Sequence, residues 1–415
     1  MSLLGLSERI LRGEAAIEDH HPFAPSNEIE EVAAGTAFVL SFANVSVFAT
    51  GAGLCLVDTG SAFAAGPIHD AVRTWSPAPV DTAVYTHGHI DHVFGTAAFE
   101  EEGHPMRVVA HEAVNPRFDR YVRTAGYNRV INQRQFGAKG LQWPVEYRHP
   151  DVTYTDRLDL DVGGLAIELH HARGETDDHT WVWVPDGKVL CTGDLIIWCT
   201  PNAGNPQKVQ RYAAEWAVAL RTMADLGAEV LLPGHGLPIA GADTVRAVLT
   251  DTAELLESLE TQTLALMNDG ARLDDVLHTV EAPAQLLDKP YLRPIYDDPE
   301  FVVRNIWRLY GGWYDGNPAS LKPAPDAALA AELAALAGGP ARLAGRAVEL
   351  ADAGDLRLAG HLAEMAALAA PEDRDVHAAR ADVYERRAQA EPSLMAKGVF
   401  RWAAAESKAR SGEIG

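Results

Sequence analysis

The chain has 415 residues, of which 47% are hydrophobic and 22% are charged, and these values are typical of a globular protein with two or three domains. Its formal net charge of −23 argues against binding to nucleic acid or to an anionic membrane surface. No apolar run reaches the roughly 18 residues that a membrane span needs, and the N-terminus lacks the basic-then-apolar pattern of a signal peptide. We therefore expect a cytoplasmic protein without a membrane span.

The first 245 residues alternate between predicted strands and helices. Apolar runs predict strands at 36–46, 54–57, 84–86, 105–111, 165–172, 179–185, 188–194 and 230–236. Residues 185–188 (PDGK) are typical of a hairpin turn, and residues 213–229 have helical periodicity. The polar segment 112–145 predicts a long loop, and loops of that length are usually functional.

After residue 245 the sequence predicts helices alone. The span 246–268 is amphipathic, and residues 326–411 are rich in Ala and Leu. This second span is interrupted at Gly338-Gly339-Pro340, Gly354-Asp355, Pro371 and Pro392. The resulting helices of about 12–18 residues are like the antiparallel pairs of tetratricopeptide repeats. We therefore expect a catalytic domain at 1–245 and a helical domain at 246–415 that serves packing or dimerisation, with a peptide-binding groove as the alternative.

The three cysteines, Cys55, Cys191 and Cys199, do not have the spacing of a zinc knuckle. Their odd number also argues against a disulfide framework. We expect them to be buried as small apolar side chains.

The strongest chemical signal is the segment 86–92 (THGHIDH), which directly follows a predicted strand. Neutral imidazole and carboxylate are the ligands that a catalytic zinc ion prefers. The four side chains of His87, His89, Asp91 and His92 cannot all lie on one face of a helix, whereas a loop can direct them to two metals. The segment therefore indicates a two-metal site.

The pattern His-x-His-x-Asp-His resembles the signature of the metallo-β-lactamase superfamily. The resemblance implies an α/β fold, the αββα sandwich, with one metal on the first His pair and a second metal on the Asp-His pair. It also implies a bridging Asp after a later strand, for which Asp194 in CTGD fits. A late His is implied as well, and His235 in LPGHG fits it.

The superfamily places one more His about twenty residues before the bridging Asp, and here that position holds Glu175. Glu175 itself and the nearby His179 compete for this role, and position favours Glu175. His179 would then orient a ligand or contact the substrate.

A Glu at this position looks like the alkylsulfatase branch of the superfamily. The segment 125–137 resembles that branch's pocket lining, and 309–318 resembles the start of its helical dimerisation domain, which implies a tetratricopeptide-like, all-α dimerisation region and a homodimer. Better-known members continue into a sterol-carrier-like domain, and we expect this chain to be a short form that lacks it. The stretch 195–208 also departs from the branch, which leaves the substrate more open than the reaction class.

The resemblance implies a hydrolase with two Zn²⁺ or other divalent ions that acts on a small sulfate ester. Metal-activated water would attack the ester, with Asp91 and Asp194 orienting it and His179 as the general acid. The residues that we expect to bind the substrate are Arg134, Lys208, Asn205, Tyr212, Phe136 and Tyr127. Arg173 and Arg211 are interpreted as surface charges. Trp143 and Trp198 are candidates for an apolar pocket, whereas Trp181 and Trp183 are expected in the core.

Two alternatives stay open at this point. The first is a dizinc hydrolase of another ester, namely a lactone, thioester, β-lactam or phosphodiester, which a nearly neutral metal core would suit. The second is an iron-dependent oxidoreductase on the same fold. The flavodiiron relatives would have Glu where His89 stands, which argues against this second alternative.

Overall fold

The computed structural model describes residues 2–412, which form two compact units. The larger unit comprises the chain up to Ala125 together with Trp143–Trp313, and the smaller unit comprises Gly126–Gln142 and the chain from Tyr314 onward. The division into domains at residue 245 stays a prediction, and the compact units follow different bounds. Within residues 2–412, no helix is long and apolar enough to cross a membrane.

The larger unit contains two mixed β-sheets. The first has its seven strands in chain order: β1 (Glu28–Ala33), β2 (Thr36–Leu40), β3 (Val45–Thr50), β4 (Gly53–Val57), β5 (Val80–Val84), β6 (Arg107–His111) and β7 (Val152–Tyr154). Strands β1–β4 are antiparallel neighbours, and β4–β7 run parallel. The second sheet has the order β13 (Ile239–Ala240), β12 (Val230–Pro233), β11 (Val189–Gly193), β10 (Thr180–Val184), β9 (Leu165–His171) and β8 (Arg157–Val162).

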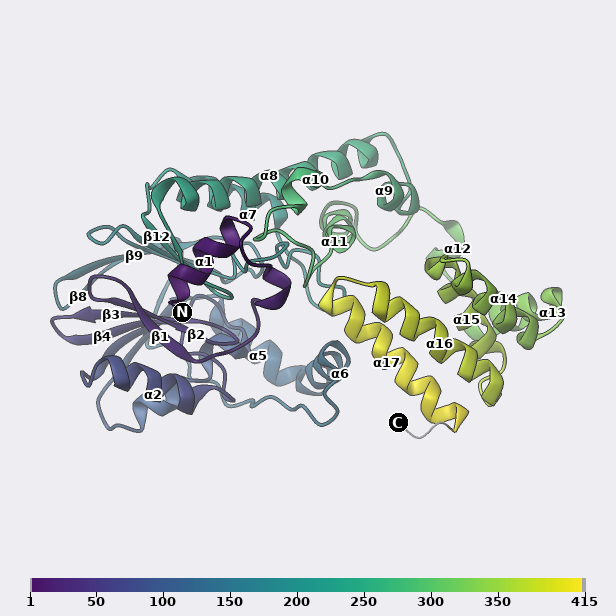
Figure 1. Cartoon of the computed structure of the whole chain (residues 1–415), viewed down its shortest axis with the longest axis horizontal. Helices are drawn as coiled ribbons and strands as arrows, with labels where there is room; N and C mark the ends of the chain where they lie inside the picture. Colours follow the sequence, from purple (N-terminus) through teal and green to yellow (C-terminus); the bar gives the residue numbers. More distant parts are fainter. Residues whose placement is uncertain (1, 413–415) are drawn as a thin grey trace. The chain divides into compact units, whose positions relative to one another are not determined.

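The alternation of side chains along the strands explains the layers. Val45 and Val47 of β3 point to one face of the first sheet and pack with Ile68 of α2 (Ala65–Trp75), whereas Phe48 points to the other face. Phe48 shares a core with the second sheet, α7 (Ala213–Ala224) and α8 (Ala242–Asn268). Figure 1 shows α2 on one side of the larger unit and α8 on the other. The αββα sandwich predicted from the sequence is confirmed.

Further helices connect or cover the sheets of the larger unit. They are α1 (Leu3–Leu11), the 3₁₀-helix Ile17–Asp19, α3 (Ile90–Val93), α4 (Thr96–Glu100), α5 (Val114–Arg123), α9 (Leu273–Thr279), α10 (Ala284–Leu287) and α11 (Pro299–Gly311). The expectation of a loop at 112–145 was wrong, because α5 and α6 (Ala125–Phe136) occupy most of it. Most residues of both helices are polar, so the sequence shows no clear helical pattern of apolar residues. Helix α5 nevertheless buries Val114 and Phe118 on a short apolar face. The three cysteines are buried and unpaired, as expected.

The smaller unit is helical. Besides α6 it contains α12 (Pro318–Leu321), α13 (Asp326–Ala337), α14 (Pro340–Asp352), α15 (Leu356–Ala369), α16 (Arg374–Ala390) and α17 (Leu394–Ser411). The breaks between α13 and α17 fall at the predicted Gly and Pro positions. Helix α17 packs tightly on α6, because a Cβ on Gly398 would lie only 1.9 Å from the carbonyl oxygen of Gln135.

Hydrogen bonds join the two sheets of the larger unit at one edge. The Thr180 N–H at the start of β10 donates to the Thr86 carbonyl after β5 at 2.6 Å. The Asn44 side-chain amide donates to the carbonyls of Pro233 and Gly236 at 3.0 and 2.9 Å. The Gly234 N–H after β12 also donates to the Gly193 carbonyl of β11 at 2.8 Å. Together these bonds hold the loops that follow β5, β11 and β12 near one another, and those loops carry most of the predicted metal ligands.

Candidate metal centre

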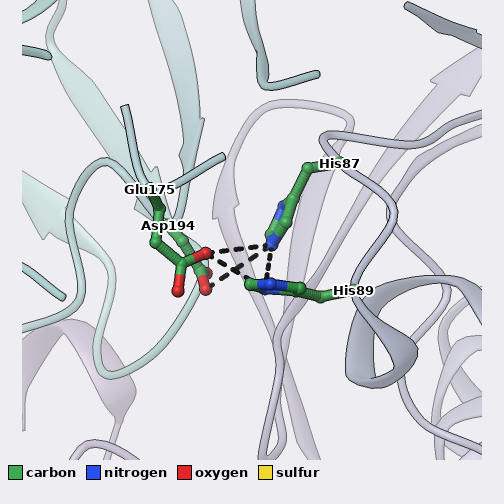
Figure 2. Close-up of side chains that lie close together, drawn as sticks. All are labelled: His87, His89, Glu175 and Asp194. Atoms are coloured by element: carbon green, nitrogen blue, oxygen red, sulfur yellow. Dashed lines mark hydrogen bonds and ion pairs between the residues drawn. The ribbon is translucent and has the colours of Figure 1, made fainter. Parts of the chain in front are cut away.

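Four side chains converge in a first cluster, to which three separate loops contribute. His87 and His89 follow β5, Glu175 lies between β9 and β10, and Asp194 directly follows β11. Figure 2 shows the four side chains pointing toward one another, and one ligand atom from each lies within 4.8 Å of the others. His87 Nε2 and His89 Nδ1 lie 3.3 and 3.0 Å from Glu175 Oε2.

A second cluster adjoins the first through Asp194. Its members are Asp91, His92 and His235. His92 Nε2 lies 3.3 Å from Asp194 Oδ1, and His235 Nε2 lies 3.3 Å from Asp194 Oδ2. Because Asp194 Oδ2 also lies 3.8 Å from His87 Nε2, this carboxylate stands between the two clusters.

The hydrogen bonds on the far side of the rings fix the tautomers of two histidines. The Nδ1 of His92 donates to Asp58 Oδ2 at 2.7 Å, and the Nδ1 of His235 donates to the Phe42 carbonyl oxygen. In a neutral ring the Nε2 atom is then left with a lone pair, and that lone pair faces the carboxylate of Asp194. Two electron-rich atoms attract each other at such distances only through a cation between them.

Unsatisfied buried atoms test whether this donor set fits metal ions. His92 Nε2, Glu175 Oε2 and Asp194 Oδ1 are all buried, and none of them has a hydrogen-bond partner. Unpaired buried polar atoms cost free energy, so natural proteins rarely leave three together. Imidazole nitrogens and carboxylate oxygens are the donors that divalent zinc prefers. The residues present therefore fit two divalent ions, one in each cluster.

The electrostatics of the site favour bound positive charge. Burial by itself would raise the pKa of Asp194, but His235 and His92 hold that pKa well below its usual range. Glu175 behaves in the same way, because His89 and Arg211 outweigh its burial and keep its pKa low. Burial by itself would lower the pKa of His92, whereas the surrounding carboxylates, with Asp194 first, raise it well above its usual value. Ionised carboxylates thus attract a cation, which can be a proton or a metal.

Arg211 was expected at the surface, and that expectation was wrong. Its side chain is only 2% exposed, and its Nη2 lies 3.4 Å from Glu175 Oε1. The Asn202 side-chain amide also donates to this oxygen, so that Glu175 directs only its other oxygen, Oε2, to the histidines. The sequence interpretation failed because the residues just before Arg211 are partly or fully exposed, and only the ion pair with Glu175 shows that its side chain turns inward. Arg173, by contrast, is exposed as expected and pairs with Glu215.

His179 lies beside the first cluster without belonging to it. Its Nε2 accepts the backbone N–H of Asp194 at 3.1 Å, and its ring stacks on His87 with 5.0 Å between centroids. Burial, followed by the neighbouring His87, lowers its pKa well below the usual value. A buried neutral ring whose Nε2 already accepts a hydrogen bond has no proton on that atom for a leaving group. This geometry suits an orienting role rather than that of the general acid.

Asp58 was missed as a functional residue by the sequence reasoning. Besides holding His92, it accepts hydrogen bonds from the backbone N–H and the hydroxyl of Thr86, both at 2.7 Å. Its own backbone is left-handed, with φ of 61°. A usable signal was present, because Asp58 ends a buried strand, and neighbouring parallel strands end at the same edge of a sheet.

The predicted substrate-binding residues fall into two groups. In the larger unit, Lys208 and Tyr212 are partly buried and Asn205 is buried. The Arg173 guanidinium lies 4.5 Å from the centroid of the Tyr212 ring, and the side-chain oxygen of Asn205 accepts the N–H of Gln207. The other three, Arg134, Phe136 and Tyr127, lie on α6 in the smaller unit, where Tyr127 is 62% exposed.

The expectations for the tryptophans have mixed outcomes. Trp181 and Trp183 are buried in the core, as expected. Trp198 is not available to line a pocket, because it is fully buried and its indole N–H donates to the Leu237 carbonyl at 2.6 Å. Trp143 is partly exposed and packs against the exposed Phe63, with 5.2 Å between ring centroids.

Comparison with known proteins agrees with this arrangement. A model of the metallo-β-lactamase superfamily matches residues 39–235, and a model described as alkyl sulfatase dimerisation matches residues 272–410. A linear primary-alkylsulfatase from a Pseudomonas species is 29% identical over 359 residues, which cover 79% of this chain and 66% of that protein. An (R)-specific secondary-alkylsulfatase from Pseudomonas sp. is 27% identical and is matched over 83% of this chain and 57% of its own length.

A solved structure shares the fold. The stereoselective inverting sec-alkylsulfatase Pisa1 from Pseudomonas sp. superimposes with a TM-score of 0.82 at 23% identity, over 94% of this chain and 66% of that chain. The chain thus spans about two thirds or less of the length of the relatives that it matches.

We predict that the buried pair of Arg211 and Glu175 matters for stability. In metal-free protein, Arg211→Met should lower the free energy of unfolding by about 3–5 kcal/mol, because it leaves a buried carboxylate without its cation. The matched control is Arg173→Met, which removes an exposed pair and should cost at most about 1 kcal/mol. Urea denaturation with a chelator present measures both values. Equal small losses in the two variants would contradict the prediction.

Proposed function

From the premise that this chain belongs to the metallo-β-lactamase superfamily and to its alkylsulfatase-like branch, we propose that it is a dinuclear zinc hydrolase of alkyl sulfate esters. The observation that carries the proposal is the position of Glu175, whose Oε2 faces both His87 and His89. The dimerisation region and the alkylsulfatase relatives support the same substrate class.

The proposed ligands divide between two ions. His87, His89 and Glu175 would hold the first ion, and Asp91, His92 and His235 would hold the second, with Asp194 available to either. Two bound zinc ions would supply Lewis-acid charge and activate a water molecule for attack on the ester. Asp91 is the most exposed carboxylate of the site, with 16% of its side chain accessible. It is therefore placed to orient water that enters from solvent, and Asp194 orients the same water from the buried side.

Counting the charges of this chain explains how a carboxylate-rich site accepts an anionic substrate. Asp91, Glu175 and Asp194 contribute three negative charges and a sulfate monoester brings another, and two divalent ions would together offset these four charges. Arg211 pairs directly with Glu175 and offsets one of them. Lys208 adds a second positive charge, and the pKa of its ammonium group is lowered by burial first and then by Arg211. Because Arg211 offsets the charge of Glu175, the site does not favour an uncharged ester over an anionic one.

The same chain features give His179 a positioning role in the proposal. By accepting the Asp194 N–H, its ring fixes the start of the loop from which Asp194 projects. A Cβ on Gly193 would lie only 2.8 Å from the His179 ring, so the two segments are in close contact. His179 thus acts on the reaction through Asp194, without touching the reacting atoms.

We further propose a homodimer through the region 272–410. Helix α13 is apolar apart from Asp326 and Glu332, yet Leu329, Leu333 and Leu336 are exposed in the single chain. A helix that is apolar all round is normally buried, so a second copy is the expected cover for this face.

We predict that the purified chain binds two zinc ions and releases inorganic sulfate from primary or secondary alkyl sulfates. Glu175→Gln should keep the shape of the site but remove a charged ligand, and its sulfate release should fall by about 100-fold or more. Ion chromatography measures sulfate, and elemental analysis after dialysis measures bound metal. The control Glu215→Gln alters an exposed carboxylate and should retain full activity.

The proposal is overturned if the zinc-loaded chain hydrolyses a lactone, thioester, β-lactam or phosphodiester and no alkyl sulfate. Iron in the purified protein together with oxygen consumption would instead favour an oxidoreductase.

We predict a pH dependence of substrate binding that is caused by Lys208. Its burial, followed by the nearby Arg211, lowers the pKa of its ammonium group to about 8. The group is charged below this pKa and attracts the anionic ester, so this attraction is lost as the pH rises through about 8. The KM for an alkyl sulfate should therefore rise above pH 8 in the wild type, whereas Lys208→Arg stays charged and should keep a flat KM. Lys208→Met should have a KM about tenfold higher at pH 7.

We predict that light scattering after size exclusion gives twice the mass of one chain. Glutamate in place of both Leu329 and Leu333 should shift the protein toward the monomer, because charges are costly at a buried apolar contact. The control Leu358→Glu changes an exposed leucine on α15 and should leave the mass unchanged. A wild-type chain that stays monomeric at all concentrations would contradict the proposal.

A further inference from the structure

A buried ion pair joins the two segments that supply the ligands of the first cluster. Asp178 lies in the loop between β9 and β10, three positions after Glu175, and is completely buried. Its Oδ2 accepts the backbone N–H of Gly88 at 2.8 Å, and Gly88 stands between His87 and His89. Two segments that are 90 residues apart in sequence are thus tied at the metal centre.

Arg117 completes this arrangement from a third segment, α5. Its guanidinium is 3% exposed, and its Nε donates to Asp178 Oδ1 at 2.7 Å. A second nitrogen, Nη2, donates to the neighbouring Asp177. Burial by itself would raise the pKa of Asp178, but Arg117 lowers that pKa to about 2, so the carboxylate stays ionised. Both oxygens of Asp178 are therefore occupied, one by Arg117 and one by the backbone between the two histidines.

The packing at Gly88 shows how closely the pair fits this turn. A Cβ on Gly88 would lie 2.9 Å from Arg117 Cδ and 3.1 Å from Asp178 Oδ2. The backbone between His87 and His89 is therefore confined by contact as well as by the hydrogen bond. A larger side chain at this position would therefore collide with Arg117 and Asp178.

The second cluster is positioned by different groups. His92 is held by Asp58, and His235 is held by the Phe42 carbonyl. Neither Arg117 nor Asp178 has a described hydrogen bond or ion pair to any of these residues. A disturbance of the Arg117–Asp178 pair should thus act directly on the first cluster, whereas it can reach the second only through His179 and Asp194.

We propose that Arg117 and Asp178 are positioning residues for the first metal alone, because they lock the His87–His89 turn to the loop that carries Glu175. The inference rests on the proposed function insofar as the site must bind two ions. Groups that orient metal ligands typically change metal affinity by about 10–100-fold when they are removed. Through this pair, the affinity for the first ion can change without an equal change in the affinity for the second.

The test measures the affinity of each ion directly. Full-length protein is titrated with Co²⁺ against a chromophoric chelator, and the visible spectrum is recorded at each step. His89→Ala and His235→Ala identify which binding step and which spectral bands belong to each cluster. Asp178→Asn should weaken the step that His89→Ala abolishes by about 10–100-fold. It should leave the step that His235→Ala abolishes within about twofold of the wild type.

Two further variants separate positioning from general stability. Arg117→Lys should restore part of the first-cluster affinity that Arg117→Met loses, because a cation again faces Asp178. Asp177→Asn is the matched control, since Asp177 is 47% exposed and touches Arg117 but not Gly88. Its effect on either step should stay within about twofold.

The outcome of the titrations distinguishes the inference from the proposed function. Unchanged affinities in Asp178→Asn, or equal weakening of both steps, would overturn the inference while leaving the proposed function intact. A wild-type chain that binds no metal would overturn the proposed function and the inference together. Selective weakening of the first-cluster step, with partial recovery in Arg117→Lys, would support the inference.

Discussion

The structure of this protein depends on the concentration of three carboxylates and four imidazoles in one buried place. Asp194 lies between the two clusters, and its oxygens face histidine nitrogens at 3.3 Å on two sides. Such a collection of lone pairs is unfavourable in a low-dielectric interior unless cations neutralise it. The hydrogen bonds at Nδ1 of His92 and His235 direct their Nε2 atoms at Asp194, and this arrangement suits a bound cation, either a proton or a metal ion.

The fold meets this constraint by joining its two sheets at one edge. The loops after β5 and β11 supply ligands from different sheets, and the hydrogen bond between Thr180 and Thr86 links those two sheets. Asp58 then uses one carboxylate to hold both Thr86 and His92. The groups that hold His92 and His235, namely Asp58 and the Phe42 carbonyl, lie just beyond the ends of strands β4 and β2, and this placement limits how far the site can relax.

Glu175 affects both the net charge of the site and the class of substrate that we propose for it. In place of a neutral histidine it adds a negative charge, and Arg211 balances that charge from the opposite side. The carboxylate thus faces the histidines with one oxygen and pairs with Arg211 through the other. The proposal of a sulfatase relies on this arrangement, because the charge of Arg211 offsets that of Glu175.

The sequence by itself determined the parts of this protein that are local. The segment 86–92 reveals its chemistry because its ligands are close together and follow a strand, and the breaks at Gly and Pro predict the helices of the smaller unit because these residues end helices wherever they occur. The resemblance to the metallo-β-lactamase superfamily, drawn from such local patterns, is confirmed.

Only the tertiary structure decided which side chains are buried and which ones meet across long separations. Arg211 looked like a surface charge, and Asp58 looked like the end of a strand. The pairing of Arg117 with Asp178 had no local sign, since 61 residues separate them. The choice between Glu175 and His179 as the neighbour of His87 and His89 also depended on tertiary contacts, because both side chains can bind a metal. In the fold, Glu175 lies with the two histidines, whereas His179 Nε2 accepts the backbone N–H of Asp194.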